Sequence, residues 1–360
     1  MTSPGSAGSL RTAQAAPAAV GTPHPRPRPE PDTDRPAVQA LDLVKTYQVK
    51  GRAEAVRALD GLSITVEPGI VFGLLGPNGA GKSTTVKILT TLAAADSGSA
   101  TVAGLDVARD PAAVRRAIGV VAQRSGADPV ATGRENLLLQ GRLYGLRGAE
   151  LARRADALLD RFDLADAGRR QVKTYSGGMQ RRLDVALGLV HRPQVLFLDE
   201  PTTGLDPEAR TAMWEEITRL AGDEGLTILL TTHYLGEADR RAARLAIVDQ
   251  GRVVVEGTPD SLKGELHGDA VHVELREAVA DTLPVYELLG RVPGIREISV
   301  DGRRVSARAD DGAAAVPAVL AALDHADRPV AAVTVARPSL DDVYLRHAGR
   351  SFADAEGDPR

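Results

Sequence analysis

A glycine-rich segment, GPNGAGKST, occupies residues 76–84 directly after the apolar run GIVFGLL. Glycines allow backbone N–H groups to surround phosphate oxygens, and a helix that starts here directs its positive end at the same anion. Lys82 supplies a cation for the β- and γ-phosphates, and Ser83 supplies a hydroxyl ligand for Mg²⁺. The spacing therefore predicts a binding site for a nucleoside triphosphate with Mg²⁺.

An acidic pair, Asp199 and Glu200, ends a second apolar run, VLFL. Alone, such a pair at the end of a strand is usually a solvated turn. With a phosphate loop in the same chain, we expect Asp199 to hold Mg²⁺ through water. We expect Glu200 to orient and deprotonate the attacking water.

A third segment, YSGGMQRRLDVAL, begins at residue 175. Ser176 is typical of a helix cap, and Gly177 and Gly178 expose backbone donors at the start of that helix. An ordinary capped helix is the alternative. We expect Arg181 and Arg182 to be solvated charges on this helix. Because the chain has one phosphate loop, a second anion-binding helix end suggests that it serves the nucleotide of a partner subunit.

These motifs together resemble the nucleotide-binding subunit of ATP-binding cassette (ABC) transporters. GPNGAGKST is similar to the Walker A motif, VLFLDEP to Walker B, and YSGGMQ to the family signature, from whose L-S-G-G-Q it departs at Tyr175 and Met179. Three further motifs are similar to family segments: AQRSGADPVATGRENL, which carries Gln123, TTGLDP, which carries Asp206, and TTH, which ends at His233. The resemblance covers residues 38 to about 265 and rests on these six motifs in the family's order. It implies an α/β fold, the P-loop NTPase cassette, with a mostly parallel core sheet, an antiparallel β subdomain and a helical insertion.

The resemblance also implies roles for individual residues. The Walker A residues that bind ATP are Gly76, Pro77, Asn78, Gly79, Ala80, Gly81, Lys82, Ser83 and Thr84. Tyr47 stacks on the adenine, although an ordinary strand residue is the alternative. His233 contacts the γ-phosphate, where a structural histidine is the alternative. Gln123 senses Mg²⁺ and the transmembrane partner, unless it is only a polar loop residue.

The implied mechanism is a clamp of two identical cassettes that face each other head to tail. ATP held by one subunit is covered by Ser176, Gly177, Gly178 and Asp206 of the other, and hydrolysis separates the two. The catalytic residues are Glu200, His233, Gln123 and Lys82, and the Mg²⁺ ligands are Ser83, Gln123 and Asp199. The cleft between the core and the helical insertion would grip a cytoplasmic helix of a separate permease.

The pattern of apolar residues places these motifs on an alternation of strands and helices. Runs such as IVFGLL, VLFL and TILL are continuously apolar, as expected of parallel strands covered on both faces. RLAIVDQGRVVVEG predicts a hairpin that turns at Gln250–Gly251. Leu151, Ala155 and Leu158 share one face of a helix within the insertion.

We expect four regions along the chain. Residues 1–36, rich in Pro, Ala and Arg, predict a disordered tail. The cassette spans 37–265, with the helical insertion at about 124–192. Residues 266–348 predict a small α+β accessory domain of order strand-helix-strand-strand-helix-strand, and 349–360 a second tail. PSLDDVYLRHAGR, at 338–350, resembles the end of the daunorubicin-resistance branch of drug exporters, which implies antibiotic efflux.

Composition limits the remaining alternatives. The 360 residues carry 44 basic and 48 acidic side chains, a balance that argues against a nucleic-acid partner. Without cysteine there is no thiol nucleophile or zinc–thiolate site. No apolar run approaches the roughly 20 residues of a membrane span, so we expect a soluble protein held at the cytoplasmic face of the membrane by its permease.

Three other functions stay open in the sequence. The cargo is a lipid or polysaccharide in one of them. In another, the chain is a soluble ATPase that acts on DNA or ribosomes, although it lacks sustained heptads and a second phosphate loop. The third is a nucleotide-binding regulator without turnover, against which the presence of Glu200 argues.

Overall fold

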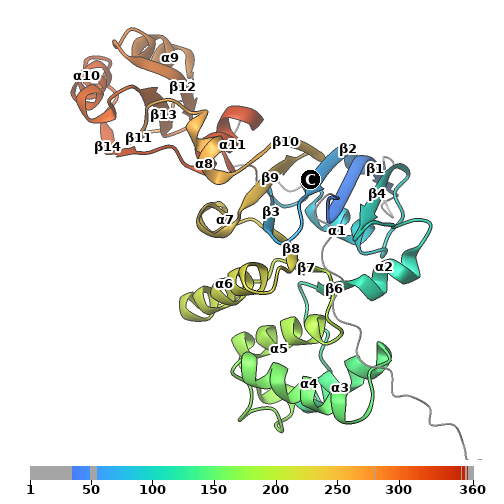
Figure 1. Cartoon of the computed structure of the whole chain (residues 1–360). Helices are drawn as coiled ribbons and strands as arrows, with labels where there is room; N and C mark the ends of the chain where they lie inside the picture. Colours follow the sequence, from blue (N-terminus) through green and yellow to red (C-terminus); the bar gives the residue numbers. More distant parts are fainter. Residues whose placement is uncertain (1–34, 49–54, 280, 350, 353–354, 356–360) are drawn as a thin grey trace, which may run out of the picture. The chain divides into compact units, whose positions relative to one another are not determined.

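The computed structural model describes residues 35–48, 55–279, 281–349, 351–352 and 355 (Figure 1). The strands are β1 (Val38–Tyr47), β2 (Val56–Val66), β3 (Val71–Leu75), β4 (Ser97–Val102), β5 (Leu105–Asp106), β6 (Ile118–Val121), β7 (Val195–Asp199), β8 (Thr227–Thr232), β9 (Arg244–Asp249), β10 (Arg252–Gly257), β11 (Asp269–Leu275), β12 (Ile295–Asp301), β13 (Arg304–Ala309) and β14 (Val330–Ala336). Apart from residues 35 and 36, the predicted N-terminal tail lies outside the described residues.

The helices lie between these strands and after the last one. They are α1 (Lys82–Leu89), α2 (Pro111–Ala117), α3 (Gly133–Leu143), α4 (Gly148–Arg161), the 3-10 turn η1 (Val172–Thr174), α5 (Gly177–Leu189), α6 (Pro207–Gly222), α7 (Leu235–Arg241), α8 (Pro259–Gly264), α9 (Leu283–Gly290), α10 (Gly312–His325) and α11 (Leu340–Ala348). Among the residues that the structure describes, none of these helices has both the length and the apolar character needed to cross a bilayer.

The central sheet has the strand order β10-β9-β3-β8-β7-β6. All neighbours are parallel except β10, which pairs antiparallel with β9. The predicted hairpin turn is confirmed, with Gln250 and Gly251 both at positive φ, as a tight type I′ turn requires. Because carboxyl ends of parallel strands share one edge, the segments after β3, β6, β7 and β8 meet there.

A second sheet, of order β2-β1-β4-β5, is antiparallel. Its inward side chains join α1 and the core sheet in one apolar cluster, which includes Leu43, Ile64 and Phe72. The helical insertion forms another cluster, in which Leu151, Ala155 and Leu158 of α4 lie on one buried face as predicted. The expected cassette elements are therefore present.

The C-terminal elements run β11, α9, β12, β13, α10, β14, in the predicted order. Their sheet has the strand order β12-β13-β11-β14, and every neighbouring pair is antiparallel. One face is covered by α9 and α10 through a cluster that includes Val271, Val273, Leu289 and Leu323. The fold is an α+β sandwich with its own core.

The last helix, α11, packs on the cassette and not only on the C-terminal sheet. Val343 and Tyr344 are buried with Leu235 of α7 and Leu262 of α8. Phe352 meets the Tyr344 ring edge-on, with ring centroids 5.1 Å apart. At Phe352 and Ala355, which are 6% and 4% exposed, the structure differs from the tail predicted over 349–360, because their apolar side chains complete this cluster.

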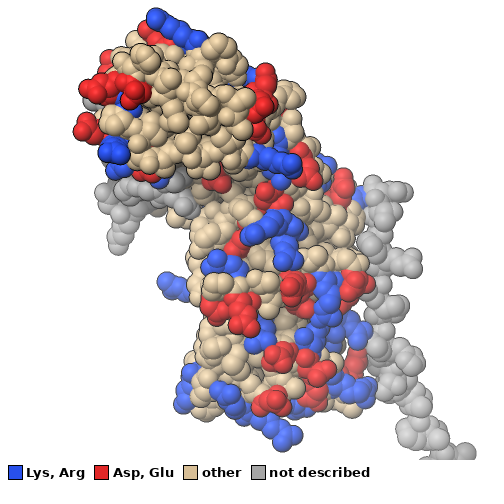
Figure 2. Space-filling view, turned by 90° about the vertical axis from the view of Figure 1, so that its left-hand side faces the viewer, with Lys and Arg blue, Asp and Glu red and all other residues tan. Residues whose placement is uncertain are grey.

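Charges on the surface are mixed in sign. On the face that Figure 2 shows, Lys and Arg side chains are interspersed with Asp and Glu.

Candidate nucleotide-binding and catalytic site

The phosphate loop lies between β3 and α1, and its glycines are required by close packing. A Cβ on Gly76 would lie 2.2 Å from the carbonyl oxygen of Val248, and one on Gly81 would lie 2.7 Å from that of Ala58. Both residues also have positive φ, which side chains rarely adopt. The backbone can therefore curve around an anion only with these residue types.

Lys82 is the first residue of α1 and is 5% exposed. Its Nζ donates to the carbonyl oxygens of Gly76 at 2.6 Å and Pro77 at 3.0 Å. A buried ammonium group is costly unless it is partnered, and here the loop's own carbonyls partner it. The loop thus holds one cation inside a backbone cradle at a helix N-terminus, which suits a phosphate group.

The other predicted loop residues surround this cation. Pro77 and Ala80 are buried, whereas Asn78, Gly79 and Ser83 are exposed and Thr84 is half-buried.

Ser83 and Asp199 come together across the sheet edge. The Ser83 hydroxyl donates to Oδ1 of Asp199 at 3.3 Å. The same oxygen accepts a 2.6 Å hydrogen bond from the hydroxyl of Thr231, at the end of β8. A hydroxyl and a carboxylate are hard oxygen ligands of the kind that Mg²⁺ prefers, so the pair fits the predicted metal.

Glu200 is contacted by residues from several segments of the site. Its backbone φ is 48°, in the left-handed region that costs a non-glycine residue about 1–3 kcal/mol. Its N–H donates to the Thr231 hydroxyl at 3.0 Å, which fixes the turn after β7. Its carboxylate accepts from Gln123 Nε2 at 3.1 Å and from the Thr203 hydroxyl at 3.2 Å. His233 Nδ1 lies 3.4 Å from Oε1 of the same carboxylate.

The signature segment begins α5 as predicted. The Ser176 hydroxyl accepts from the N–H of Met179 at 3.3 Å, and Ser176 and Gly177 are exposed. A Cβ on Gly177 would meet nothing within 4 Å. In the described part of the chain, no hydrogen bond or ion pair joins Ser176 to Ser83, Asp199 or Glu200 of the same subunit.

Two further predicted residues lie at the ends of elements. Asp206 caps α6, where its carboxylate accepts from the N–H of Ala209 at 2.8 Å, and it is exposed. Tyr47 ends β1 and pairs with Val56 of β2. Because β2 also supplies Ala58, which packs against the phosphate loop, this hairpin lies next to the loop.

Comparison with known proteins identifies the family. Residues 59–203 match the family described as ABC transporter, and residues 257–348 match the ATP-binding protein DrrA1-3-like C-terminal domain. The chain is 47% identical over 321 residues to the daunorubicin resistance ATP-binding protein DrrA2 of Streptomyces coeruleorubidus, across 89% of this chain and 97% of that relative. The chain belongs to the ATP-binding proteins of ABC transporters.

Other relatives and solved cassettes agree with this assignment. The Nod factor export ATP-binding protein I of Burkholderia thailandensis is 39% identical over 85% of this chain and 97% of that protein. The dimeric ATP-binding cassette MJ0796, in a post-hydrolysis state bound to ADP and Pi, has a TM-score of 0.57 at 25% identity. The match covers 62% of this chain and 98% of that cassette. The cassette fold predicted from the motifs is confirmed, in a family that binds and hydrolyses ATP.

Arg181 of the ABC signature helix is buried, and the expectation that it is a solvated charge is wrong. It is 7% exposed, and burial lowers its pKa. Its guanidinium donates to three carbonyl oxygens, those of Ala122 (2.5 Å), Asp199 (2.9 Å) and Pro201 (2.9 Å). Arg181 therefore joins α5 to the residue before Gln123 and to the residues on either side of Glu200. Arg182 is half-buried and donates to the Phe162 carbonyl at 3.2 Å.

A second network in the ABC cassette was not predicted. Glu237 of α7 is 8% exposed. Its Oε2 accepts from the hydroxyl of Thr202 at 2.9 Å and from the indole N–H of Trp214 at 2.7 Å. Through Thr202, this carboxylate links α7, which follows His233, to the loop that follows Glu200. No motif marks it, because a lone Glu on a short helix has no distinctive spacing.

Proposed function

We propose that the chain is the ATP-hydrolysing subunit that powers export of an antibiotic or another hydrophobic compound through a separate membrane-spanning permease. The observation that carries this proposal is the pair of family matches, residues 59–203 to an ABC transporter domain and residues 257–348 to the DrrA-type C-terminal domain. The 47% identity to a daunorubicin resistance protein, over 89% of this chain, supports the same cargo class.

The proposed roles follow from the site's geometry. Lys82 and the loop N–H groups bind the phosphates, and Glu200 accepts a proton from the attacking water. Gln123 and His233 orient the Glu200 carboxylate, which both of them contact. Ser83, Asp199 and Gln123 would hold Mg²⁺, which when bound would supply positive charge against the phosphates.

The active unit is proposed to be a dimer. The exposed start of α5, with its cap at Ser176 and with N–H groups of Gly177 and Gly178 that donate to no other described residue, is a helix end that can bind an anion. Together with Asp206, it would cover nucleotide held by the partner subunit. The dimeric solved cassette is consistent with this arrangement.

The permease is proposed to contact the helical insertion. Leu139 and Leu143 are one helical turn apart on α3 and are 53% and 73% exposed. Val130, just before the helix, is 63% exposed. These exposed apolar side chains follow Gln123 in the chain and suit contact with an apolar helix end of a membrane protein, which would hold the chain at the cytoplasmic face.

The test is an export assay in a drug-sensitive host that expresses the chain with its permease. We expect the parent pair to lower retained daunorubicin and Lys82→Ala to abolish this effect. If purified chain hydrolyses MgATP but no amphipathic antibiotic is exported, the cargo assignment is wrong and the ATPase assignment stands. Nod factor export by a relative makes lipid or polysaccharide cargo the second candidate. A lack of any turnover would leave a nucleotide-binding regulator.

A further inference from the structure

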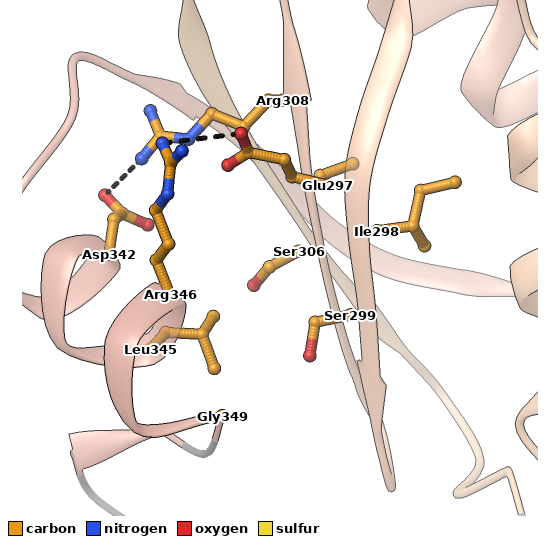
Figure 3. Close-up of a pocket in the computed structure, with 10 residues that line it drawn as sticks. Glu297, Ile298, Ser299, Ser306, Arg308, Asp342, Leu345, Arg346 and Gly349 are labelled. Atoms are coloured by element: carbon orange, nitrogen blue, oxygen red, sulfur yellow. Dashed lines mark ion pairs between the residues drawn. The ribbon is translucent and has the colours of Figure 1, made fainter. Parts of the chain in front are cut away.

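A pocket of about 450 Å³ lies in the C-terminal region, between α11 and the strands β12 and β13 (Figure 3). Its volume is within the range of about 300–1,000 Å³ that small-molecule sites occupy. One end is charged and the rest combines hydroxyl and apolar side chains. The residues that the argument uses are Ser299, Ser306, Arg308, Asp342, Leu345 and Arg346.

A β-bulge shapes the strand side of this pocket. Arg296 of β12 pairs with Arg308 of β13 and Ser299 pairs with Ser306, so β12 has one more residue than β13 between these pairs. Glu297, in the bulge, has a φ of 50°. In a regular strand without the bulge, Ser299, three residues after Arg296, would point to the opposite face. The bulge thus directs the hydroxyls of Ser299 and Ser306 to the same side, and Figure 3 shows both in the pocket.

Arg308 is a buried cation with few partners. It is 5% exposed. Within the described residues, its five N–H donors make one hydrogen bond, from Nη1 to the carbonyl oxygen of Gly268 at 3.3 Å, and one ion pair, from Nη2 to Oδ2 of Asp342 at 3.8 Å. A buried charge is costly unless it is closely paired. Burial accordingly lowers the pKa of Arg308.

The nearest carboxylate, that of Asp342, is paired with Arg308 only at long range and shares its oxygen with other donors. Oδ2 of Asp342 already accepts from the N–H and the hydroxyl of Ser339, both at 2.8 Å, as part of the α11 capping box. Arg346 places a second guanidinium at the same end of the pocket (Figure 3), and its charge also lowers the pKa of Arg308. Its own partners are Oε1 of Glu297 at 3.5 Å and the carbonyl of Glu265 at 3.0 Å.

We propose that this pocket binds a small organic anion, whose carboxylate or phosphate group lies between Arg308 and Arg346. Guanidinium groups donate paired hydrogen bonds to such anions. Ser299 and Ser306 supply hydroxyls next to the charged end, and Leu345 supplies apolar contact for the rest of the molecule.

Helix α11 connects the pocket to the catalytic edge of the cassette, that is, the sheet edge at which Gln123, Asp199, Glu200 and His233 lie. Asp342 and Arg346 face the pocket, whereas Val343 and Tyr344 pack against the cassette. Among their neighbours is Leu235 of α7, two residues after His233. A ligand that draws Arg346 toward Arg308 would therefore bias the position of α11 against α7. This regulatory consequence, unlike the binding itself, rests on the proposed ATPase function.

The binding test uses the full chain carrying Lys82→Ala, which removes the lysine of the phosphate loop as a competing phosphate site. Calorimetric titration with inorganic phosphate and, separately, with benzoate is compared with sodium chloride at matched ionic strength. We expect saturable binding of at least one anion. Benzoate alone would identify a carboxylate ligand, and phosphate alone a phosphate ligand.

Variants then locate the site. Arg346→Gln, at a partly exposed position, is expected to weaken binding at least tenfold, and Ser306→Ala severalfold. Arg291→Gln is the matched control, an exposed arginine at the end of α9, and is expected to bind as the parent does. Equal binding by Arg346→Gln and the parent would overturn the proposal, as would the absence of saturable binding by either anion.

The regulatory arm measures ATPase activity with Lys82 intact. We expect saturating anion to change kcat in the parent and not in Arg346→Gln. If the anion binds but kcat does not change, the anion site is supported and the proposed regulatory link through α11 is wrong. The absence of ATPase activity under all conditions would instead count against the proposed function, since anion binding is measured independently.

Discussion

The guanidinium of Arg181 donates a hydrogen bond to the main-chain oxygen of Asp199, 2.9 Å away, from inside the signature helix. Through its bonds to Ala122 and Pro201, the same side chain spans both segments that carry Gln123 and Glu200. The helix that is proposed to cover the partner's nucleotide is therefore fixed to the catalytic edge of its own subunit. A shift of this helix on dimer closure would be transmitted directly to the carboxylates.

Replacing Arg181 tests this connection. Arg181→Met leaves three carbonyls without their donor, and we expect the free energy of unfolding to fall by about 2–4 kcal/mol. Arg181→Lys is expected to recover only part of the loss, because an ammonium group cannot reproduce the guanidinium fork. Urea denaturation measures both variants. Exposed Arg169→Met is the control, and equal stability of Arg181→Met and this control would contradict the role.

Glu200→Gln tests the base. The amide keeps the size of the side chain and can still meet Gln123 and Thr203, but it cannot take a proton from water. We expect kcat for ATP hydrolysis to fall by roughly 10²–10⁴-fold with nucleotide affinity unchanged. Phosphate release and fluorescent-nucleotide titration measure the two quantities. Turnover at the parent rate would require another base, and Glu215→Gln, on an exposed face of α6, serves as the control.

Ser176→Arg tests binding in trans. The side chain is exposed and no contact of the described fold occupies the space in front of Gly177, so a large cation there should leave the monomer folded. We expect MgATP-dependent dimerisation to be lost in the Glu200→Gln background, where dimers should otherwise accumulate. Size-exclusion chromatography with light scattering measures it. Glu215→Gln changes the net charge by the same one unit at an exposed position and serves as the control. A dimer that persists in Ser176→Arg would exclude the proposed contact.

The sequence predicted the catalytic edge because its positions depend on local features. Continuous apolar runs identify the strands, and the residue after each run must lie at the carboxyl edge of a parallel sheet. Gly76, Asp199 and His233 could therefore be placed together from the sequence alone. The positive φ of Glu200 could not, since nothing in DEP marks a left-handed residue.

Residues whose role depends on tertiary packing were missed. Arg181 follows Gln180 on a helix with charged neighbours, and only the approach of β6 and β7 makes its position buried. Thr231 is one of two threonines at the end of β8, and strand propensity alone explains both. In the C-terminal region, the β-bulge of β12 that aligns Ser299 with Ser306 contains no glycine, so the sequence does not indicate it.

His191 provides a pH test of the helical insertion. Its ring stacks on Tyr144 with centroids 3.6 Å apart, Nε2 meets the carbonyl of Ile118 at 2.8 Å, and burial lowers its pKa from 6.5 to about 4. Because the unfolded chain binds this proton more readily, the histidine's contribution is complete above pH 6.5 and is lost as pH falls toward 4. At pH 5 the loss is about 2 kcal/mol.

The measurement compares urea denaturation of the parent and of His191→Gln between pH 7 and pH 5. Carboxylates titrate in both proteins, so the informative quantity is the difference between the two pH dependences. We expect the parent to lose about 2 kcal/mol more than the variant over this interval. Parallel pH profiles would mean that the folded protein accepts a proton on this half-buried ring without cost, and would contradict the prediction.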